Sequence, residues 1–231
     1  MADQASAELV WGDNDTPVSV VFDDPYYSRE NGLAETRAVF LEGNNLPERF
    51  ACAPCDPFHI AELGFGTGLN FLATSKLWQT SAPTIANLRF TSFEAYPMSA
   101  TDMARALSAW PELAELSRPL LNAWSPASDQ FELEMSGIRL TVHIGDARQT
   151  IEKLQSQQDA WYLDGFNPAK NADLWDADLL CQVCERTKAG GTFSTYTSAG
   201  WVRRNLTAAG FEVEKVKGFG HKRERLQGFK P

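Results

Sequence analysis

From about residue 58 to the C-terminus, segments with the composition of β-strands alternate with segments that have a helical pattern. Residues 58–64 (FHIAELG) predict a buried strand, residues 69–79 a helix and residues 89–95 a second strand. Regular alternation of this kind is typical of a parallel sheet with helices on both of its faces. We therefore expect an α/β fold in this part of the chain.

The alternation continues to the end of the chain. The remaining predicted elements are a helical stretch at 99–121, a hairpin turn at Ser136–Gly137 that leads into a third strand, a fourth strand at 160–165, a helix at 173–188 closed by Gly190–Gly191, a fifth strand at 192–197, a helix at 199–210 ended by Gly210, and two final strands at 211–218 and 223–229. The first 57 residues lack this rhythm. We expect residues 1–57 to form an N-terminal extension or cap and residues 58–231 to form the main domain.

Composition narrows the class of protein. The chain has 231 residues, too few for two full-sized domains, and its 14 Phe, 7 Trp and 5 Tyr supply enough aromatic surface for a core. No stretch approaches the ~18 uninterrupted apolar residues of a membrane span. The N-terminus also lacks the basic start and apolar run of a secretory signal, so we expect a cytoplasmic protein without a membrane partner.

The distribution of charge is uneven. The net charge of −9 argues against a nonspecific polyanion binder. Residues 215–231, however, contain six basic residues and one acid, so this tail carries +5 and the remainder of the chain −14. The basic tail is either a solvated edge or a surface that contacts phosphate.

Four cysteines form two Cys-x-x-Cys pairs, Cys52/Cys55 and Cys181/Cys184. Such pairs can bind zinc, but these two are far apart, and the second lies in a helical pattern where cysteines more often pack as small apolar side chains. The three histidines are isolated from one another. We predict no metal site and, in a cytoplasmic chain, no disulfide framework.

The string ELGFGTGLN joins the first predicted strand to the first predicted helix. Its glycines, Gly64, Gly66 and Gly68, let the backbone turn sharply and approach a ligand closely. The spacing is GxGxG rather than the GxGxxG of dinucleotide binders, and an acid just before it, here Glu62, marks enzymes that use S-adenosylmethionine (SAM). We predict that these residues and Asn70 bind SAM; the alternative is a purely structural tight turn.

Acidic residues also follow the next two predicted strands. Glu94 ends the second strand, where a carboxylate can accept both ribose hydroxyls of a nucleoside. Asp146 follows the third strand, where it could accept a hydrogen bond from an adenine amino group, aided by the Ala147 backbone N–H. Ligands of open α/β sheets bind at the carboxyl ends of strands, so these acids are predicted to converge on one cofactor.

The fourth predicted strand ends in YLDGFNPAK. In amine methyltransferases an acid or amide followed by an aromatic residue holds the attacking nitrogen at this place. Freeing the lone pair of an alkylammonium with a pKa near ~10.4 costs about 4.6 kcal/mol at pH 7. Asp164 could accept that proton or orient the neutral amine, and the Phe166 ring could face the methyl group and the sulfonium. The alternative for Asp164 is a helix cap or turn former.

Taken together, AELGFGTGLNFL, SFEA, GDA, YLDGFNPAKN and GFGHKRE closely resemble the methyltransferase half of the bacterial MnmC-type tRNA-modifying enzymes, also found as freestanding MnmD-type proteins. The N-terminal FDDPYYSRENGLAETRAVFLEGNNL matches as well, so the resemblance covers about residues 11–228. It implies a class I SAM-dependent methyltransferase fold: a Rossmann-like, mostly parallel seven-stranded sheet with helices on both faces and a terminal antiparallel strand pair, plus the N-terminal extension.

The resemblance also implies an activity. Members of this family methylate the 5-aminomethyl group of 2-thiouridine at the wobble position of tRNA, giving 5-methylaminomethyl-2-thiouridine. In fused members a flavin-dependent domain, which would supply the aminomethyl substrate, follows the methyltransferase half. The sequence leaves open whether this chain is a freestanding enzyme or one half of a fused protein.

Recognition of an anticodon loop would require aromatic and basic side chains near the reacting centre. Behind Phe166, the residues predicted to contact RNA are Lys170, Trp201, His221, Lys222 and Arg223. Phe219 stands next to the last three of these residues and adds aromatic character there. Weaker candidates are Tyr26 and Tyr27 for the pocket wall, Arg203 and Arg204 for phosphate, and Asp23, Asp24 and Glu35 for substrate or cofactor-side contacts. For Tyr26, Tyr27 and Trp201 core packing is an equally good interpretation, and for Arg203 and Arg204 helical surface charge is a better one.

Other functions remain open at this point. SAM could donate its methyl group to a small-molecule or protein amine, which the acidic net charge favours slightly. The chain could also be a noncatalytic nucleoside-binding protein or a nicotinamide-dependent oxidoreductase.

Overall fold

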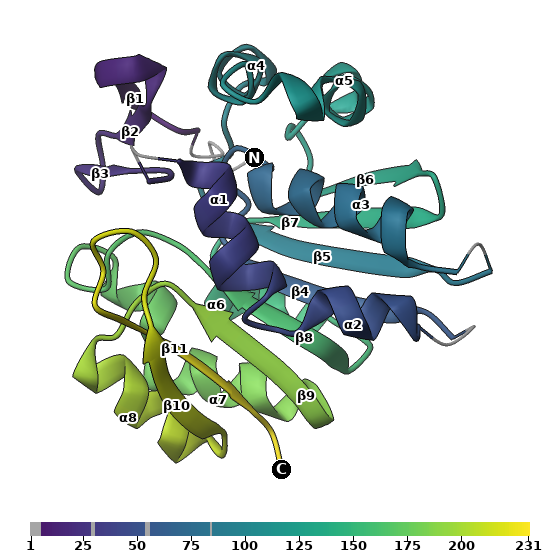
Figure 1. Cartoon of the computed structure of the whole chain (residues 1–231). Helices are drawn as coiled ribbons and strands as arrows, with labels where there is room; N and C mark the ends of the chain where they lie inside the picture. Colours follow the sequence, from purple (N-terminus) through teal and green to yellow (C-terminus); the bar gives the residue numbers. More distant parts are fainter. Residues whose placement is uncertain (1–5, 29–30, 54–55, 84) are drawn as a thin grey trace.

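A mixed sheet of eight strands forms the centre of the computed structural model, which describes residues 6–28, 31–53, 56–83 and 85–231 (Figure 1). The strand order is β10-β11-β9-β8-β4-β5-β7-β6. The strands are β4 (Phe58–Leu63), β5 (Leu88–Glu94), β6 (Gln130–Met135), β7 (Ile138–Ile144), β8 (Gln158–Leu163), β9 (Thr187–Thr195), β10 (Glu212–Lys217) and β11 (Glu224–Phe229). The central strands β9, β8, β4, β5 and β7 are parallel, and the α/β prediction is confirmed.

The sheet has one strand more than the predicted seven. The hairpin turn at Ser136–Gly137 is present, with positive φ at both residues. Its first strand, β6, also joins the sheet, pairing antiparallel with β7 from Met135↔Ile138 to Gln130↔His143. β6 alternates exposed and less exposed residues, as expected of an antiparallel edge strand with one solvated face. At the opposite edge β10 and β11 form the predicted antiparallel pair.

Helices cover both faces of the sheet (Figure 1). One face carries α1 (Gly32–Thr36), α2 (Leu46–Ala51), α3 (Leu69–Ser81), α4 (Ala100–Leu107) and α5 (Ala114–Ala123), and the other α6 (Ala147–Thr150), α7 (Ala177–Glu185) and α8 (Gly200–Ala209). The first group buries Phe71 and Leu120 against Phe90 of β5, whereas the second buries Leu180 and Val202 against Trp161 of β8. Among the described residues, no helix is long and apolar enough to cross a membrane.

The predicted boundary at Gly190–Gly191 is wrong. The helix α7 ends at Glu185, and the two glycines lie inside β9. Pairing between β8 and β9 jumps from Gln158↔Thr187 to Ala160↔Thr192, so β9 bulges between these pairs. Gly190 adopts a φ of 74°, which suits glycine, and the pair therefore serves a strand bulge rather than a helix end.

The helical stretch predicted at 99–121 is divided in two. After α4 the chain makes the short 3-10 turn η3 (Pro111–Leu113) and then enters α5. Proline cannot donate the backbone hydrogen bond that a continuous helix requires, so Pro111 begins a new helical segment. By contrast, the predicted end of α8 at Gly210 is confirmed, with a left-handed φ of 109°.

The N-terminal segment forms a small sheet of its own and then packs on the large one. β1 (Leu9–Trp11), β2 (Pro17–Ser19) and β3 (Asp24–Pro25) pair antiparallel. The remaining short helical turns are η1 (Asp13–Asp15), the π-helical η2 (Arg37–Leu41), η4 (Ile151–Lys153) and η5 (Ala172–Trp175). Leu33, Phe40 and Phe50 share a buried cluster with Ile60 of β4, so the segment contributes to the core. The division at residue 57 stays a prediction.

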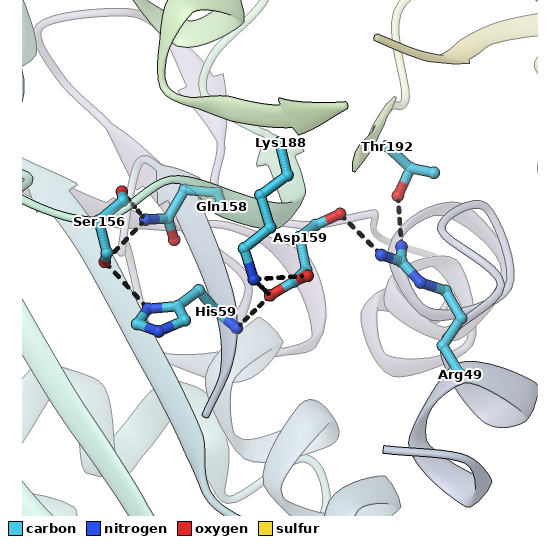
Figure 2. A network of polar contacts seen from close by, with 7 residues as sticks. All are labelled: Arg49, His59, Ser156, Gln158, Asp159, Lys188 and Thr192. Atoms are coloured by element: carbon cyan, nitrogen blue, oxygen red, sulfur yellow. Dashed lines mark hydrogen bonds and ion pairs between the residues drawn. The ribbon is translucent and has the colours of Figure 1, made fainter. Parts of the chain in front are cut away.

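A polar network fastens the N-terminal segment to the sheet at the end opposite to the carboxyl ends of β4 and β8 (Figure 2). The Arg49 guanidinium donates hydrogen bonds to the Thr192 hydroxyl at 2.8 Å and to the Asp159 carbonyl at 2.9 Å. The Asp159 carboxylate in turn accepts from the His59 backbone N–H at 2.8 Å and pairs with Lys188. One side chain of α2 thereby connects two central strands.

Replacing Arg49 by methionine is expected to destabilise the protein. The change keeps the apolar stem but removes the charge-assisted hydrogen bonds of the guanidinium to Thr192, to the Asp159 carbonyl and to the Asn44 carbonyl, a loss of about 2–3 kcal/mol. Thermal unfolding of Arg49→Met should then show a melting temperature lower by about 5–10 °C. The control is Arg203→Met, which changes an exposed arginine on α8. Equal melting temperatures for the two variants would contradict the role of this network.

Candidate active site

A cavity of about 490 Å³ opens at the carboxyl ends of β4, β5, β7 and β8. The residues predicted to bind the cofactor or to act in catalysis that line it are Gly64, Gly66, Asn70, Glu94, Asp146, Ala147, Asp164 and Phe166. Residues from four strand ends thus lie together because parallel strands finish at the same edge of the sheet. The sequence interpretation placed them there, and the structure brings them into one cavity.

The glycine turn between β4 and α3 adopts a backbone that favours glycine. Gly64, Gly66 and Gly68 have φ values of 87°, 53° and 77°. A Cβ on Gly66 would lie 3.3 Å from the Tyr26 ring, on the cavity side, and one on Gly68 would lie 3.1 Å from Leu120 and Phe65. Gly66 therefore keeps the cavity open for a ligand, whereas Gly68 allows α3 to pack closely.

A chain of buried hydrogen bonds runs from β4 to the cavity. The Glu62 carboxylate is fully buried and accepts hydrogen bonds from the Ser92 hydroxyl at 2.7 Å and the Asn70 amide at 2.9 Å. The same amide nitrogen donates to the Asp164 carboxylate at 2.8 Å. Burial raises the pKa of Glu62 well above its usual range. Glu62 lies behind the cavity wall and acts on the cavity through Asn70.

The carbonyl side of the Asn70 amide is held as well. The Thr36 hydroxyl, at the end of α1, donates to Asn70 Oδ1 at 2.7 Å. Both ends of the amide therefore have fixed partners, and this fixes which of its atoms faces Asp164.

Glu94 is buried and meets the glycine turn directly. Its carboxylate accepts from the Gly66 N–H at 2.7 Å and from the Tyr96 N–H at 2.8 Å. Burial raises the pKa of Glu94, although these backbone hydrogen bonds oppose the shift. The side chain lines the cavity at the end of β5, where a nucleoside ribose would lie.

Asp146 is engaged by a partner that sequence reasoning missed. Its carboxylate accepts from the Arg148 backbone N–H at 2.9 Å and pairs with the Arg148 guanidinium at 2.6 Å. These hydrogen bonds lower the pKa of Asp146. Arg148 also pairs with Asp173 of η5 at 3.1 Å, so it joins the β7 end of the cavity to the segment after β8. A carboxylate accepts several hydrogen bonds, so an adenine amino group can still share it.

Asp164 occupies the centre of the cavity wall. Besides the Asn70 bond, its carboxylate accepts from the Gly165 N–H at 2.8 Å. Burial raises the pKa of Asp164 to about 6, and the two hydrogen bonds limit the shift. At neutral pH this carboxylate is mostly ionised, yet its proton affinity is well above that of an aspartate in water.

Aromatic rings surround Phe166. Its ring stacks on Phe22 at a centroid distance of 4.7 Å and meets the edge of Tyr26 at 4.8 Å. Phe22 and Tyr26 both come from the N-terminal segment, so that segment supplies part of the cavity wall. The stacking of Phe22 was not expected, because nothing in the local sequence links it to residue 166.

The residues predicted to contact RNA fall into two groups. Lys222 lines the cavity, and both Lys222 and Arg223 line an adjoining groove. Lys170 pairs with Asp23 at 3.0 Å, His221 is exposed, and Trp201 packs partly buried against the second core cluster. The structure does not bring Lys170, Trp201 or His221 into the cavity lining.

The weaker candidates divide in the same way. Those that line the cavity are Asp24, Tyr26, Tyr27 and Glu35, whereas Asp23, Arg203, Arg204 and Phe219 do not. Tyr196, directly after β9, lines both the cavity and the groove and was not predicted. Only its position at a strand end could have indicated it.

The part of the chain that the structure describes contains no cluster of three or more His, Cys, Asp or Glu side chains that could hold a metal ion. Cys52 and Cys181 are exposed and Cys184 is buried, all as free thiols. Cys55 lies outside the described residues, so the first Cys-x-x-Cys pair cannot be compared.

The cavity has a glycine turn on one side and buried carboxylates at neighbouring strand ends. This arrangement is that of a nucleoside-binding α/β enzyme. The Asp164 carboxylate, next to the aromatic cluster around Phe166, suits methyl transfer to an amine. The chain belongs to the S-adenosyl-L-methionine-dependent methyltransferase family, whose model matches residues 111–231. The residues of the cavity fit SAM. The absence of a Cβ at Gly66 keeps the cavity wide beside the glycine turn, and the Glu94 carboxylate can accept hydrogen bonds from the ribose hydroxyls.

Relatives and solved structures agree with this class. The chain is 50% identical over 226 residues to the tRNA 5-methylaminomethyl-2-thiouridine biosynthesis bifunctional protein MnmC of Pseudomonas fluorescens, covering 96% of this chain and 34% of that protein. It is similar to the crystal structure of MNMC2 from Aquifex aeolicus, with a TM-score of 0.76 and 25% identity over 100% of this chain and 73% of that one. The chain spans about a third of the length of the curated relatives it matches.

A more distant structure supports the fold alone. The precorrin-6y C5,15-methyltransferase of Geobacter metallireducens has a TM-score of 0.53 and 11% identity, covering 95% of this chain and 96% of that one. The predicted class I fold is confirmed, and so is the predicted resemblance to the MnmC-type enzymes.

Changing Glu94 to glutamine is expected to weaken SAM binding. The amide oxygen accepts hydrogen bonds from the Gly66 and Tyr96 N–H groups and from the ribose hydroxyls more weakly than a carboxylate does. We expect a loss of about 1.5–3 kcal/mol in binding free energy, which raises the dissociation constant about 10–100-fold. Isothermal titration calorimetry measures the change. Glu132→Gln, on the exposed side of β6, is the matched control and should bind SAM as the unaltered protein does. Wild-type affinity in Glu94→Gln would contradict the assignment.

Proposed function

We propose that the chain transfers a methyl group from SAM to the 5-aminomethyl group of 5-aminomethyl-2-thiouridine at the wobble position of tRNA, giving 5-methylaminomethyl-2-thiouridine. The observation that carries this proposal is Asp164, an acid with raised proton affinity held by Asn70 beside an aromatic cluster at the end of β8. The name of the relatives, which specifies biosynthesis of this nucleoside, supports the choice of acceptor.

Within this proposal the cofactor lies across the strand ends. When bound, SAM supplies a methyl group activated by its sulfonium. Gly64, Gly66 and Asn70 would hold it on the side nearest β4, Glu94 would accept the ribose hydroxyls, and Asp146 with the Ala147 N–H would hold the adenine. Glu62 and Gly68 act from behind the wall by holding Asn70 and the helix α3.

Asp164 acts on the acceptor nitrogen. An aminomethyl group arrives mostly protonated, and its nitrogen attacks only after a proton leaves. The Asp164 carboxylate accepts that proton or a hydrogen bond from the neutral amine, and its fixed position aligns the lone pair with the methyl group. Phe166, packed between Phe22 and Tyr26, is proposed to present the remaining apolar surface of its ring to the uridine and to the sulfonium.

The remaining parts of the proposal concern tRNA. Lys222 and Arg223 line the groove that adjoins the cavity and are proposed to contact the anticodon loop, and Lys170, His221 and Trp201 are proposed as further contacts. Residues 1–57 are proposed as a cap on the methyltransferase domain, residues 58–231. The relatives are bifunctional and about three times as long, so we propose that a flavin-dependent domain or enzyme supplies the aminomethyl group, in the cytoplasm.

The direct test uses hypomodified tRNA and labelled SAM. The unaltered protein should label tRNA, and Asp164→Ala should lower the transfer rate by about 10²–10⁴-fold while SAM still binds, because the substitution removes the proton acceptor. Asp178→Ala, on the exposed start of α7, is the control. Label that enters a small amine but no RNA would reject the tRNA assignment, and an active Asp164→Ala would reject the catalytic one.

The pH dependence of kcat/KM should report Asp164. Its carboxylate accepts a proton only when ionised, so transfer is lost as the pH falls through its pKa of about 6. Above pH 6 the slope of log kcat/KM against pH is set by deprotonation of the acceptor amine. Below pH 6 the protonation of Asp164 should make this slope steeper by about one. In Asp164→Asn the overall rate should be lower, and the change of slope near pH 6 should be missing. A break that persists would assign it to another group.

A further inference from the structure

A second concavity adjoins the cavity. It is a groove of about 380 Å³ lined by Asn167, Pro168, Tyr196, Thr197, Ser198 and Lys222 to Glu224. Asn167, Tyr196 and Lys222 line the groove and the cavity alike. A ligand in the groove would therefore touch side chains that also face the acceptor position.

Lys222 is the charged residue at this junction. Its ammonium donates to the Glu35 carboxylate at 2.7 Å and lies 4.2 Å from the centre of the Tyr196 ring. The side chain of Lys222 is 44% exposed, whereas that of Glu35 is only 13% exposed. When the pair separates, Lys222 is thus the partner that can turn toward the groove, and Glu35 stays in the cavity wall.

The lining of the two concavities differs in charge. Besides Lys222 and Arg148, the charged residues of the cavity are acids: Asp24, Glu35, Glu94, Asp146, Asp164 and Asp173. The groove contains Lys222 and Arg223, one acid and the hydroxyls of Thr197 and Ser198. A cationic amine suits the first, and a phosphodiester suits the second.

The Glu35–Lys222 pair is electrostatically connected to Asp164. Beyond burial, which raises the pKa of Asp164 most, the charge of Glu35 raises it and the charge of Lys222 lowers it. Moving Lys222 away would make the Asp164 carboxylate a stronger proton acceptor. It would also leave the Glu35 carboxylate open to the acceptor nitrogen.

We propose that the groove binds a phosphodiester next to the methylated nucleotide, and that Lys222 leaves Glu35 for this phosphate, so that Glu35 together with Asp164 faces the acceptor amine. The inference rests on the proposed function, since it takes the acceptor to be part of a polynucleotide. Glu35 is then a second residue that acts on the amine, and Lys222 couples phosphate binding to it.

The chemistry balances without a further reactant. The ammonium of the acceptor gives one proton to a carboxylate, and its nitrogen then forms a bond to the methyl carbon of SAM. The carbon–sulfur bond breaks, its electron pair stays on sulfur, and a neutral thioether leaves. The nitrogen carries the positive charge in the product, and the carboxylate that stays ionised stabilises it.

The binding test uses a fluorescent anticodon stem-loop with ordinary uridine, which needs no methyl transfer, and fluorescence anisotropy. Lys222→Met should weaken binding about fivefold. It should also reduce the slope of log affinity against log salt concentration by about one, the release of one counterion. Glu35→Gln should instead tighten binding at least about twofold, because it releases Lys222 for the phosphate. The matched control is Lys153→Met, an exposed lysine of η4 that pairs with Asp129 and lines neither concavity, which should bind as the unaltered protein does.

Kinetics on hypomodified tRNA separate the two partners. Lys222→Met should mainly raise KM, and Glu35→Gln should lower kcat about tenfold at saturating tRNA, since it removes an interaction with the reacting amine. A merely structural ion pair would make both variants weaken in the same way. Weaker RNA binding by Glu35→Gln, or unchanged binding by Lys222→Met, overturns the inference. If no tRNA accepts methyl, the proposed function fails, while the anisotropy result still decides whether the groove binds RNA.

Discussion

The hydrogen-bonded chain from Glu62 through Asn70 to Asp164 is the interaction on which the rest of the site depends. It places a polar amide between two carboxylates from adjacent strands, β4 and β8, and fixes both with bonds of 2.9 and 2.8 Å. Buried polar groups of this kind are costly unless every atom has a partner. Here Ser92 and Thr36 complete the set, so the position of Asp164, the proposed proton acceptor, is determined by the core.

The same arrangement explains why the site suits a cation. Glu62, Glu94 and Asp164 lie close enough that the charges of Asp164 and Glu94 add to the burial that raises the pKa of Glu62. The charges of Asp164 and Glu94 therefore disfavour the ionised form of Glu62. A sulfonium and an amine bring positive charge into this acidic environment. The free energy that the carboxylates lose on burial is partly regained when these ligands bind, which favours cationic ligands over neutral or anionic ones.

Much of this could be predicted from local sequence, and the remainder could not for a definite reason. Gly66, Glu94 and Asp164 lie at or just after the ends of predicted strands, and parallel strands bring their ends together whatever lies between them. Three contacts could not be predicted because they depend on the conformation of loops and of the N-terminal segment, which the periodicity of the sequence does not indicate. They are the Arg148–Asp146 pair, the Phe22–Phe166 stack and the Glu35–Lys222 pair. The predicted end of α7 at Gly190–Gly191 is wrong because glycine is favoured both in a strand bulge and at the end of a helix.

A crystal structure with S-adenosylhomocysteine tests the central claim most directly. The account predicts ribose hydroxyls within hydrogen-bond distance of the Glu94 carboxylate and a sulfur atom that faces the space between Asp164 and Phe166. The Asn70 amide should keep its contacts with Glu62 and Asp164. A nucleoside bound away from Glu94, or a sulfur atom directed away from Asp164, would contradict the account.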